Sequence, residues 1–135
     1  LKGESFLLAS YTCTPLVTIP TSSLENAQHV KGRTVAELGM WNMPLDMITY
    51  KKEGKEYILI ANSTRNLMRI DPDDIANFEG TLSEKVERFD TKGVKYTSIP
   101  LSVRHLDKLD DETVLIMSRM PYGSMQLTVV ASKSI

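Results

Sequence analysis

The chain has 135 residues, of which 41% are hydrophobic and 24% charged, and its 16 basic and 17 acidic side chains give a formal net charge of −1. These values are ordinary for one folded domain, and the balanced charge leaves no electrostatic footprint for nucleic acid. No apolar run approaches the ~20 residues that a membrane-spanning helix needs. We therefore expect neither a nucleic-acid partner nor a membrane span.

The first predicted element is a β-hairpin over Gly3–Leu24. Its leading strand carries the continuous apolar run Phe6–Ala9, a polar turn follows, and Pro15 opens the returning strand. A short apolar run of this kind is typical of a strand that is covered on both faces. The segment is therefore expected to form two antiparallel strands.

The next elements are an outer strand, an inner strand and a second hairpin. Lys31–Leu38 and Leu45–Tyr50 have the composition of strands, and the second hairpin covers Gly54–Ile75. Within it, Tyr57–Ala61 is predicted to be a central strand that pairs with Leu67–Asp71. The second hairpin repeats the first at an offset of 51 residues, with apolar side chains matching at the aligned strand positions. Repetition at a fixed spacing indicates a repeat architecture.

The segment after the second hairpin is predicted to be irregular. Asp71–Asp74 contains a proline at its second position and is interpreted as a type I turn. Gly80–Arg88 has too few apolar residues for a core helix, so we expect an excursion loop with at most one helical turn. The chain is therefore predicted to be nearly all β.

The last part of the chain continues the repeat. Lys92–Ile99 matches Lys31–Leu38 at an offset of 61 residues, with Lys-Gly in register. Val103–Leu106 is predicted to be a second inner strand, and Asp111–Ser132 a third, looser hairpin. The predicted cycle is an inner strand, two hairpin strands and an outer strand.

Four antiparallel strands per repeat of this length is the pattern of a β-propeller blade. The segment Pro44–Asp71 resembles a blade of the bacterial propellers of the YVTN, NHL and amine-dehydrogenase-subunit type. The resemblance implies an all-β fold and favours a periplasmic or secreted protein. It carries no catalytic motif of those proteins, and propellers host many unrelated functions.

The number of repeats gives a second expectation. The single all-β region over residues 1–135 supplies about two and a half four-stranded antiparallel blades, from the hairpin repeats 3–24, 54–75 and 111–132. A propeller closes with about four to eight blades, and an open piece leaves unpaired edge strands. We expect the remainder of a larger propeller, or a second polypeptide chain, to cover these edges. A small β-sandwich is the alternative fold.

Blade geometry brings the hairpin turns and the starts of the inner strands to one rim. This rim gathers aromatic, arginine and amide side chains, which are common anchors of binding interfaces. The residues expected there are Tyr11, Trp41, Asn42, Asp46, Asn62, Arg65, Arg104, Arg119 and Tyr122. Asp46 and Arg104 begin successive inner strands, so an ion pair between them is expected.

A soft-metal site is a weaker alternative for the same rim. Cys13, Met40, Met43 and Met120 supply sulfur ligands of the kind that Cu(I) prefers. Methionine also fills gaps between sheets, and this packing role explains the same residues. The sequence identifies no cofactor.

Two functional hypotheses follow from these patterns. The first is a non-catalytic binding or scaffold propeller that recognises a protein or a small ligand through the rim. The alternative is part of a periplasmic-type redox or hydrolytic propeller enzyme whose site is completed by further blades. No residue of this sequence is identified as catalytic.

Overall fold

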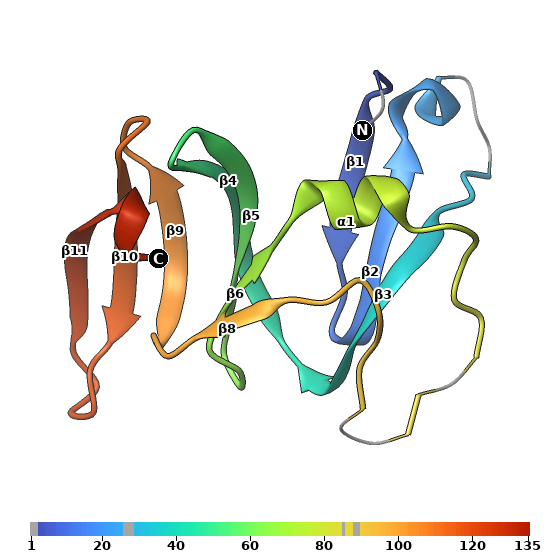
Figure 1. Ribbon diagram of the computed structural model, residues 1–135. Helices are drawn as coiled ribbons and strands as arrows, with labels where there is room; N and C mark the ends of the chain where they lie inside the picture. Colours follow the sequence, from blue (N-terminus) through green and yellow to red (C-terminus); the bar gives the residue numbers. More distant parts are fainter. Residues whose placement is uncertain (1–2, 26–28, 85, 88–89) are drawn as a thin grey trace. The chain divides into compact units, whose positions relative to one another are not determined.

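The computed structural model describes residues 3–25, 29–84, 86–87 and 90–135 (Figure 1). The chain forms two compact units, and each is described here by itself. Unit 1 comprises Leu1–Asn42 and Pro72–Lys95, and unit 2 comprises Met43–Asp71 and Tyr96–Ile135. Three antiparallel sheets of three or four strands make up the two units, which confirms the all-β prediction.

Unit 1 contains one four-stranded sheet. Its strands are, in spatial order, β1 (Phe6–Ser10), β2 (Cys13–Pro20), β3 (Arg33–Asn42) and β7 (Lys92–Gly93). A 3₁₀ turn, η1 (Thr21–Leu24), follows β2. β1 and β2 pair antiparallel, with Phe6 opposite Pro20, so the first predicted hairpin is confirmed.

The repeated Lys-Gly pair has a packing role in this sheet. Gly93 pairs with Ala36 of β3 and has a φ of +81°. A Cβ atom at this glycine would lie 2.2 Å from the carbonyl oxygen of Val35. A Cβ atom at Gly32 would lie 2.4 Å from a methyl group of Val17. Only glycine allows the backbone to approach so closely at these two positions.

The type I turn predicted at Asp71–Asp74 is wrong, because this segment begins the helix α1 (Pro72–Asn77). Proline is well suited to the first helical position, and Asp73 and Asp74 in the first turn complement the helix dipole. Ile75 is buried and anchors the helix. The described residues of the predicted excursion at 80–88 are not helical, and residues 85 and 88 lie outside the described residues.

Unit 2 contains two sheets. The first has the spatial order β4 (Pro44–Lys52), β5 (Lys55–Asn62), β6 (Leu67–Ile70) and β8 (Thr97–Ile99). The second has the order β9 (Val103–Lys108), β10 (Thr113–Arg119) and β11 (Met125–Ala131), followed by a 3₁₀ turn, η2 (Ser132–Ser134). Pairing of Ile58 with Ile70 and of Ile60 with Met68 confirms the predicted central hairpin.

The two sheets of unit 2 pack face to face around a common core. Alternate residues of β4 and β5 meet alternate residues of β9 and β10, as the two-residue period of strands requires. The core contains Tyr50, Leu59, Ala61, Leu67, Val103, Leu106, Val114, Ile116 and Ile135. The opposite face of the first sheet is also buried, at Ile58, Ile60, Met68 and Ile70. The apolar run in β5 is therefore covered on both faces. The same expectation is wrong for the run Phe6–Ala9 of β1, where Leu7 is 49% exposed.

The other face of the second sheet is apolar and exposed. On the terminal strand β11, the exposed fractions of Met125, Leu127 and Val129 are 49%, 58% and 54%. Pairing with β10 places Leu115 and Met117 on this same face. Among the described residues, β1 and β11 are end strands of their sheets, so the apolar runs expected at open edges lie there.

Tyr50 connects the core of unit 2 to the end of the chain. Its hydroxyl group donates a hydrogen bond of 2.9 Å to the main-chain oxygen of Ile135. The same oxygen accepts hydrogen bonds from Lys52 Nζ at 2.8 Å and from Arg69 Nη1 at 2.9 Å. Burial of the ring raises the pKa of Tyr50 above its ordinary value, and nearby Arg69 opposes this shift. The phenol is therefore held in its donating, neutral form.

We predict that Tyr50→Phe destabilises the protein at neutral pH by about 0.5–1.5 kcal/mol, the net contribution of one hydrogen bond. Because the pKa of Tyr50 is raised from 10.0, the folded protein keeps this proton above pH 10.0 while the unfolded chain loses it. The contribution of Tyr50 is thus fully present below pH 10.0 and declines as the pH rises towards the folded pKa. The stability difference between wild type and variant should narrow there, as measured by urea unfolding. A difference that stays constant through this range would contradict the assignment.

Candidate functional site

The starts of β4 and β9 lie at the same end of unit 2. Asp46, near the start of β4, contacts β9, and at the other end Lys51 Nζ lies 3.2 Å from Asp111 Oδ2. Pairing places the start of β4 beside the β5–β6 turn, and the start of β9 beside the β10–β11 turn. We call this the recognition end, and the β4–β5 and β9–β10 turns form the charged end.

Both inner strands carry a β-bulge at the recognition end. On β4, Pro44 lies opposite Asn62 and Asp46 opposite Ala61, so Leu45 is an extra residue without a partner on β5. On β9, Val103 and His105 lie opposite successive residues of β10, and Arg104 is the extra residue. A bulge bends its strand and redirects a side chain. The fold therefore sets Leu45 and Arg104 at equivalent positions of two successive sheets.

Asp46 joins the two sheets of unit 2 at this end. Its Oδ2 atom accepts a hydrogen bond of 3.0 Å from the main-chain N–H of Leu106, and its Oδ1 atom accepts one of 2.9 Å from Met47. His105 Nδ1 lies 3.6 Å from the same Oδ2 atom. The expected ion pair of Asp46 with Arg104 is therefore wrong. His105, which occupies the position equivalent to Asp46, is the partner instead.

Asn62 organises the β5–β6 turn and is buried. Its Oδ1 atom accepts hydrogen bonds of 3.2 Å from the main-chain N–H groups of Met43, Thr64 and Arg65. Arg65 is half-buried, and its Nη1 atom donates to the hydroxyl oxygen of Tyr96 at 3.2 Å. These two predicted rim residues are thus engaged in holding the turn, and Asn62 is not available at the surface.

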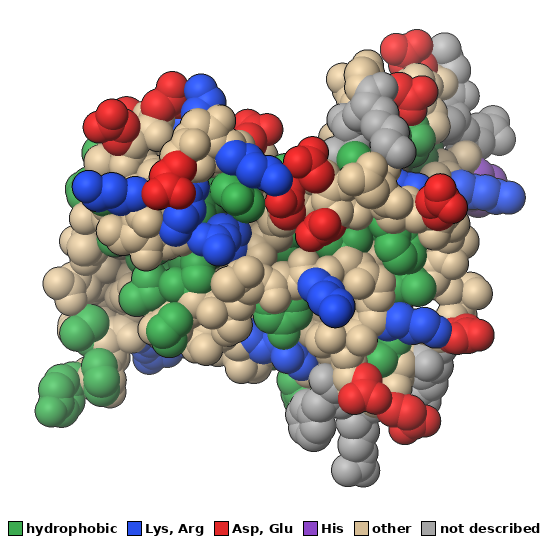
Figure 2. All heavy atoms as spheres, in the orientation of Figure 1, with side chains coloured by type: hydrophobic (Ala, Val, Ile, Leu, Met, Phe, Trp, Pro, Cys, Tyr) green, Lys and Arg blue, Asp and Glu red, His purple; other side chains and the backbone are tan. Residues whose placement is uncertain are grey.

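Arg104 and Arg119 line the same open depression at the recognition end. Its volume is about 470 Å³. The lining residues are Leu45, Arg104, His105, Arg119, Gly123 and Met125. Tyr122, at the tip of the adjacent β10–β11 turn, is 99% exposed. Figure 2 shows hydrophobic side chains gathered at the tip of this hairpin.

The remaining rim residues lie together in unit 1. Cys13 pairs with Asn42, and Asn42 Nδ2 donates a hydrogen bond of 3.1 Å to the carbonyl oxygen of Tyr11. Asn42 is buried, whereas Tyr11 and Trp41 are exposed. Trp41 has a φ of +63°, which is unusual for a bulky residue. Unit 1 therefore presents two exposed aromatic side chains near the β1–β2 turn.

The sulfur atoms of the alternative metal site are divided between the units. Cys13 and Met40 belong to unit 1, and Met43 and Met120 belong to unit 2. Within the described part of the chain, no group of three or more His, Cys, Asp or Glu side chains is arranged to hold a metal ion.

The described residues also contain no helix of the length and hydropathy that a membrane crossing requires.

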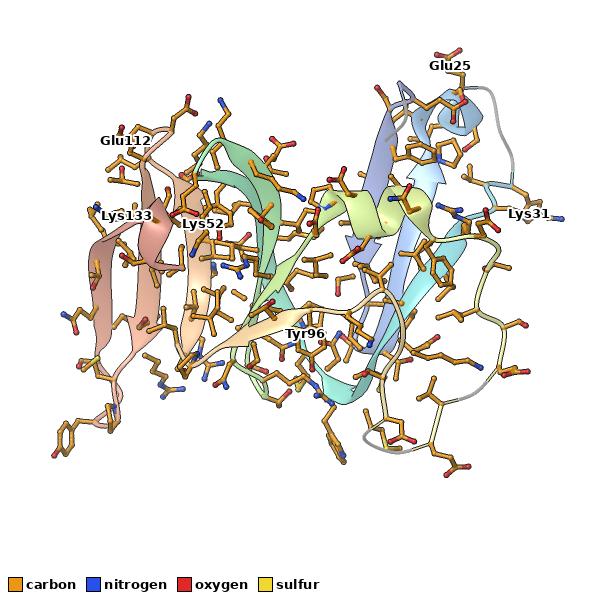
Figure 3. The ribbon with its side chains drawn as sticks, viewed as in Figure 1. Glu25, Lys31, Lys52, Tyr96, Glu112 and Lys133 are labelled. Atoms are coloured by element: carbon orange, nitrogen blue, oxygen red, sulfur yellow. The ribbon has the colours of Figure 1, made fainter. Side chains whose placement is uncertain are left out.

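The charged end of unit 2 is covered by ion pairs. Lys108 and Lys51 both contact Asp111, and these cations lower the pKa of the Asp111 carboxyl group. Acidic and basic side chains gather over this end in Figure 2, and Figure 3 places Lys52, Glu112 and Lys133 there. Exposed ion pairs contribute little to stability. This end is therefore a solvated surface, in contrast to the recognition end.

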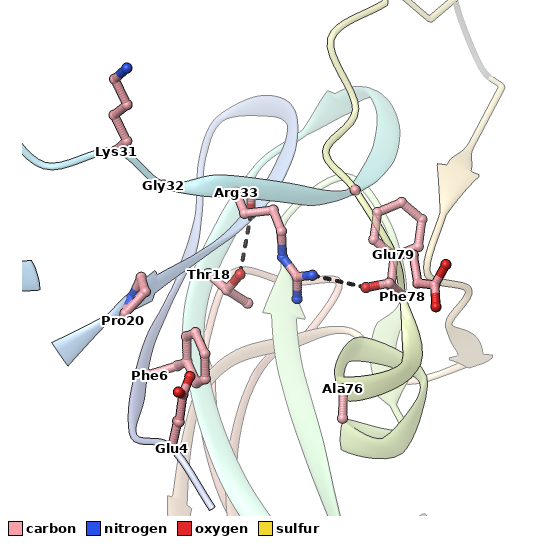
Figure 4. Close-up of a pocket in the computed structure, with 11 residues that line it drawn as sticks. Glu4, Phe6, Thr18, Pro20, Lys31, Gly32, Arg33, Ala76, Phe78 and Glu79 are labelled. Atoms are coloured by element: carbon pink, nitrogen blue, oxygen red, sulfur yellow. Dashed lines mark hydrogen bonds between the residues drawn. The ribbon is translucent and has the colours of Figure 1, made fainter. Parts of the chain in front are cut away.

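A second open depression, of about 540 Å³, lies in unit 1 (Figure 4). Two of its polar side chains form hydrogen bonds within the protein. Arg33 Nη1 donates a hydrogen bond of 2.9 Å to the carbonyl oxygen of Phe78, and Thr18 Oγ1 donates one of 3.4 Å to the carbonyl oxygen of Arg33.

Searches with the sequence and the structure against models of protein families, curated proteins and solved structures gave no match.

We predict that Asp46→Asn destabilises unit 2 by about 1–3 kcal/mol. The asparagine side chain has one acceptor oxygen where the carboxylate has two, so the main-chain N–H group of either Leu106 or Met47 loses its acceptor. His105→Gln should cost less than about 1 kcal/mol, since the side chain of His105 is 65% exposed. Urea unfolding of both variants and of the double variant measures the two contributions.

The double variant decides which contact of Asp46 matters. If the hydrogen bond to Leu106 contributes most of the stabilisation by Asp46, Asp46→Asn should lower the free energy of unfolding by the same amount, within about 0.5 kcal/mol, in the wild-type and His105→Gln backgrounds. Loss of the whole effect in the His105→Gln background would show that the histidine pair holds the sheets together, against this prediction.

Proposed function

We propose that the chain is part of a β-propeller that acts as a binding module, with the recognition end of unit 2 and the exposed aromatic residues of unit 1 as its contact surfaces. The observation that carries this proposal is the contrast between the two ends of unit 2. Arg119, Met120 and Tyr122 are exposed at one end, and paired charges cover the other. Tyrosine, tryptophan and arginine are the usual anchors of interfaces.

The internal repeat supports the propeller part of the proposal. β4, β5, β6 and β8 form a four-stranded antiparallel sheet in which each strand pairs with the next in order. β9, β10 and β11 repeat the first three strands, including the bulge at the same position of the inner strand. A blade is built in this way, with the inner strand first and the outer strand last.

The exposed face of the second sheet supports the expectation that further polypeptide packs against it. Met125, Leu127 and Val129 are each about half exposed, which is unusual for a row of apolar side chains on one strand. The equivalent strand β6 is buried on both faces and paired on both edges. We therefore propose that another sheet, from the same propeller or from a second chain, covers the part of this face that carries Leu127 and Val129.

We predict that a photo-crosslinking amino acid at Tyr122 or Trp41 forms a discrete adduct with a partner in the native cells, because both side chains project into solvent. The matched control is Glu53, an exposed residue in the β4–β5 turn at the charged end. Mass spectrometry identifies the adducts. Equal labelling at all three positions, or none at Tyr122 and Trp41, would argue against a recognition surface here.

We also predict that the purified chain self-associates through its apolar face and that Leu127→Lys with Val129→Lys returns it to a 15.2 kDa monomer. Gln126→Lys is the control, since it adds a lysine to the same strand on the other face. Light scattering coupled to size exclusion measures the mass. A wild-type chain that stays monomeric at the highest concentration reached would refute the need for a covering polypeptide and favour the small β-sandwich.

A further inference from the structure

Two arginine side chains line one depression without a partner of their own. Arg104 comes from the bulge of β9 and Arg119 from the end of β10. Neither forms a hydrogen bond or ion pair with any residue in the described ranges 3–25, 29–84, 86–87 and 90–135. The Nε atom of Arg104 is buried. Guanidinium N–H groups that have no acceptor in the protein can bind one at the depression that both side chains line.

The charge at this depression is positive. His105 adds an imidazole group beside the two guanidinium groups. The nearby carboxylate of Asp46 does not line the depression, and both of its oxygen atoms accept main-chain N–H groups, from Met47 and Leu106. The groups left facing the depression therefore favour an anion. Guanidinium groups bind planar carboxylates with two parallel hydrogen bonds.

The rest of the lining is apolar. Leu45 and Met125 are 42% and 49% exposed and border the same depression, whose volume of about 470 Å³ lies within the usual range for small ligands. A compact inorganic anion would leave both side chains exposed to water. A ligand with an acidic group at one end and an apolar group at the other would satisfy both parts of the lining.

We infer that the depression formed by Arg104, Arg119, His105, Leu45 and Met125 binds a small organic carboxylate that carries a short apolar chain. The carboxylate lies on the two guanidinium groups. The apolar chain packs against Leu45 and Met125. This inference rests on the proposed binding function of the recognition end and names the chemical class of its ligand.

The test is a titration of the whole chain with hexanoate, followed by two-dimensional NMR of the backbone amide groups. Saturable shifts are expected near Arg104 and in the β10–β11 turn. Arg104→Gln and Arg119→Gln should each weaken binding by about tenfold or more, as expected for loss of a charge-assisted hydrogen bond. Lys133→Gln, which removes an exposed cation at the charged end, should leave the affinity unchanged.

Two further ligands test the chemical class. Hexanol lacks the carboxylate and should not bind, and inorganic phosphate should bind more weakly than hexanoate. Equal binding of phosphate and hexanoate would overturn the role of Leu45 and Met125. Absence of saturable hexanoate shifts, or equal affinity in all variants, would overturn the site. Arg119 is exposed, so Arg119→Gln decides the result if Arg104→Gln does not fold.

The outcome is separable from that of the proposed function. Hexanoate binding that depends on Arg104 and Arg119, with no crosslinked partner at Tyr122, would establish a small-molecule site and remove the macromolecular contact. A crosslinked partner without hexanoate binding would leave the recognition surface in place and remove this ligand class.

Discussion

The arrangement of unit 2 depends on a hydrogen bond from the main chain of one sheet to a side chain of the other. β9 ends its sheet among the described residues, so its outward N–H groups have no strand to receive them. The carboxylate of Asp46 accepts the N–H group of Leu106 and fixes β9 against β4 in one register. As a result, the β5–β6 and β10–β11 turns lie at one end of unit 2, and the β4–β5 and β9–β10 turns lie at the other. The division into a recognition end and a charged end follows from it.

Strand periodicity made most of the fold predictable. Continuous apolar runs identified β5 and β10, and the polar turns between apolar runs identified the hairpins, because burial on a strand leaves a local signature. The helix α1 was missed because a proline followed by two aspartates suits both a type I turn and the first turn of a helix. Burial of Ile75 decides between them, and burial depends on tertiary contacts that no local pattern contains.

The candidate site was predictable in position but not in detail. Sequence spacing placed Asp46, Arg104, Arg119 and Tyr122 at one end of the sheets, because strand starts and turns follow from strand lengths. The bulges were not visible, since they depend on the register between two strands. The sequence aligned Asp46 with Arg104, whereas the strand register places His105 at the equivalent position. Burial of Asn62 was likewise hidden, because polar turn residues are usually exposed.

The bulges of β4 and β9 also determine where the surface chemistry of these sheets can change. Leu45 and Arg104 occupy the same place in two sheets, yet one is apolar and the other cationic. Because neither residue faces a partner on the adjacent strand, its side chain can be exchanged without disturbing the ladder on either side. At this position a change of side chain alters the surface chemistry without removing a hydrogen bond of the ladder. Each of the two sheets of unit 2 offers one such variable position.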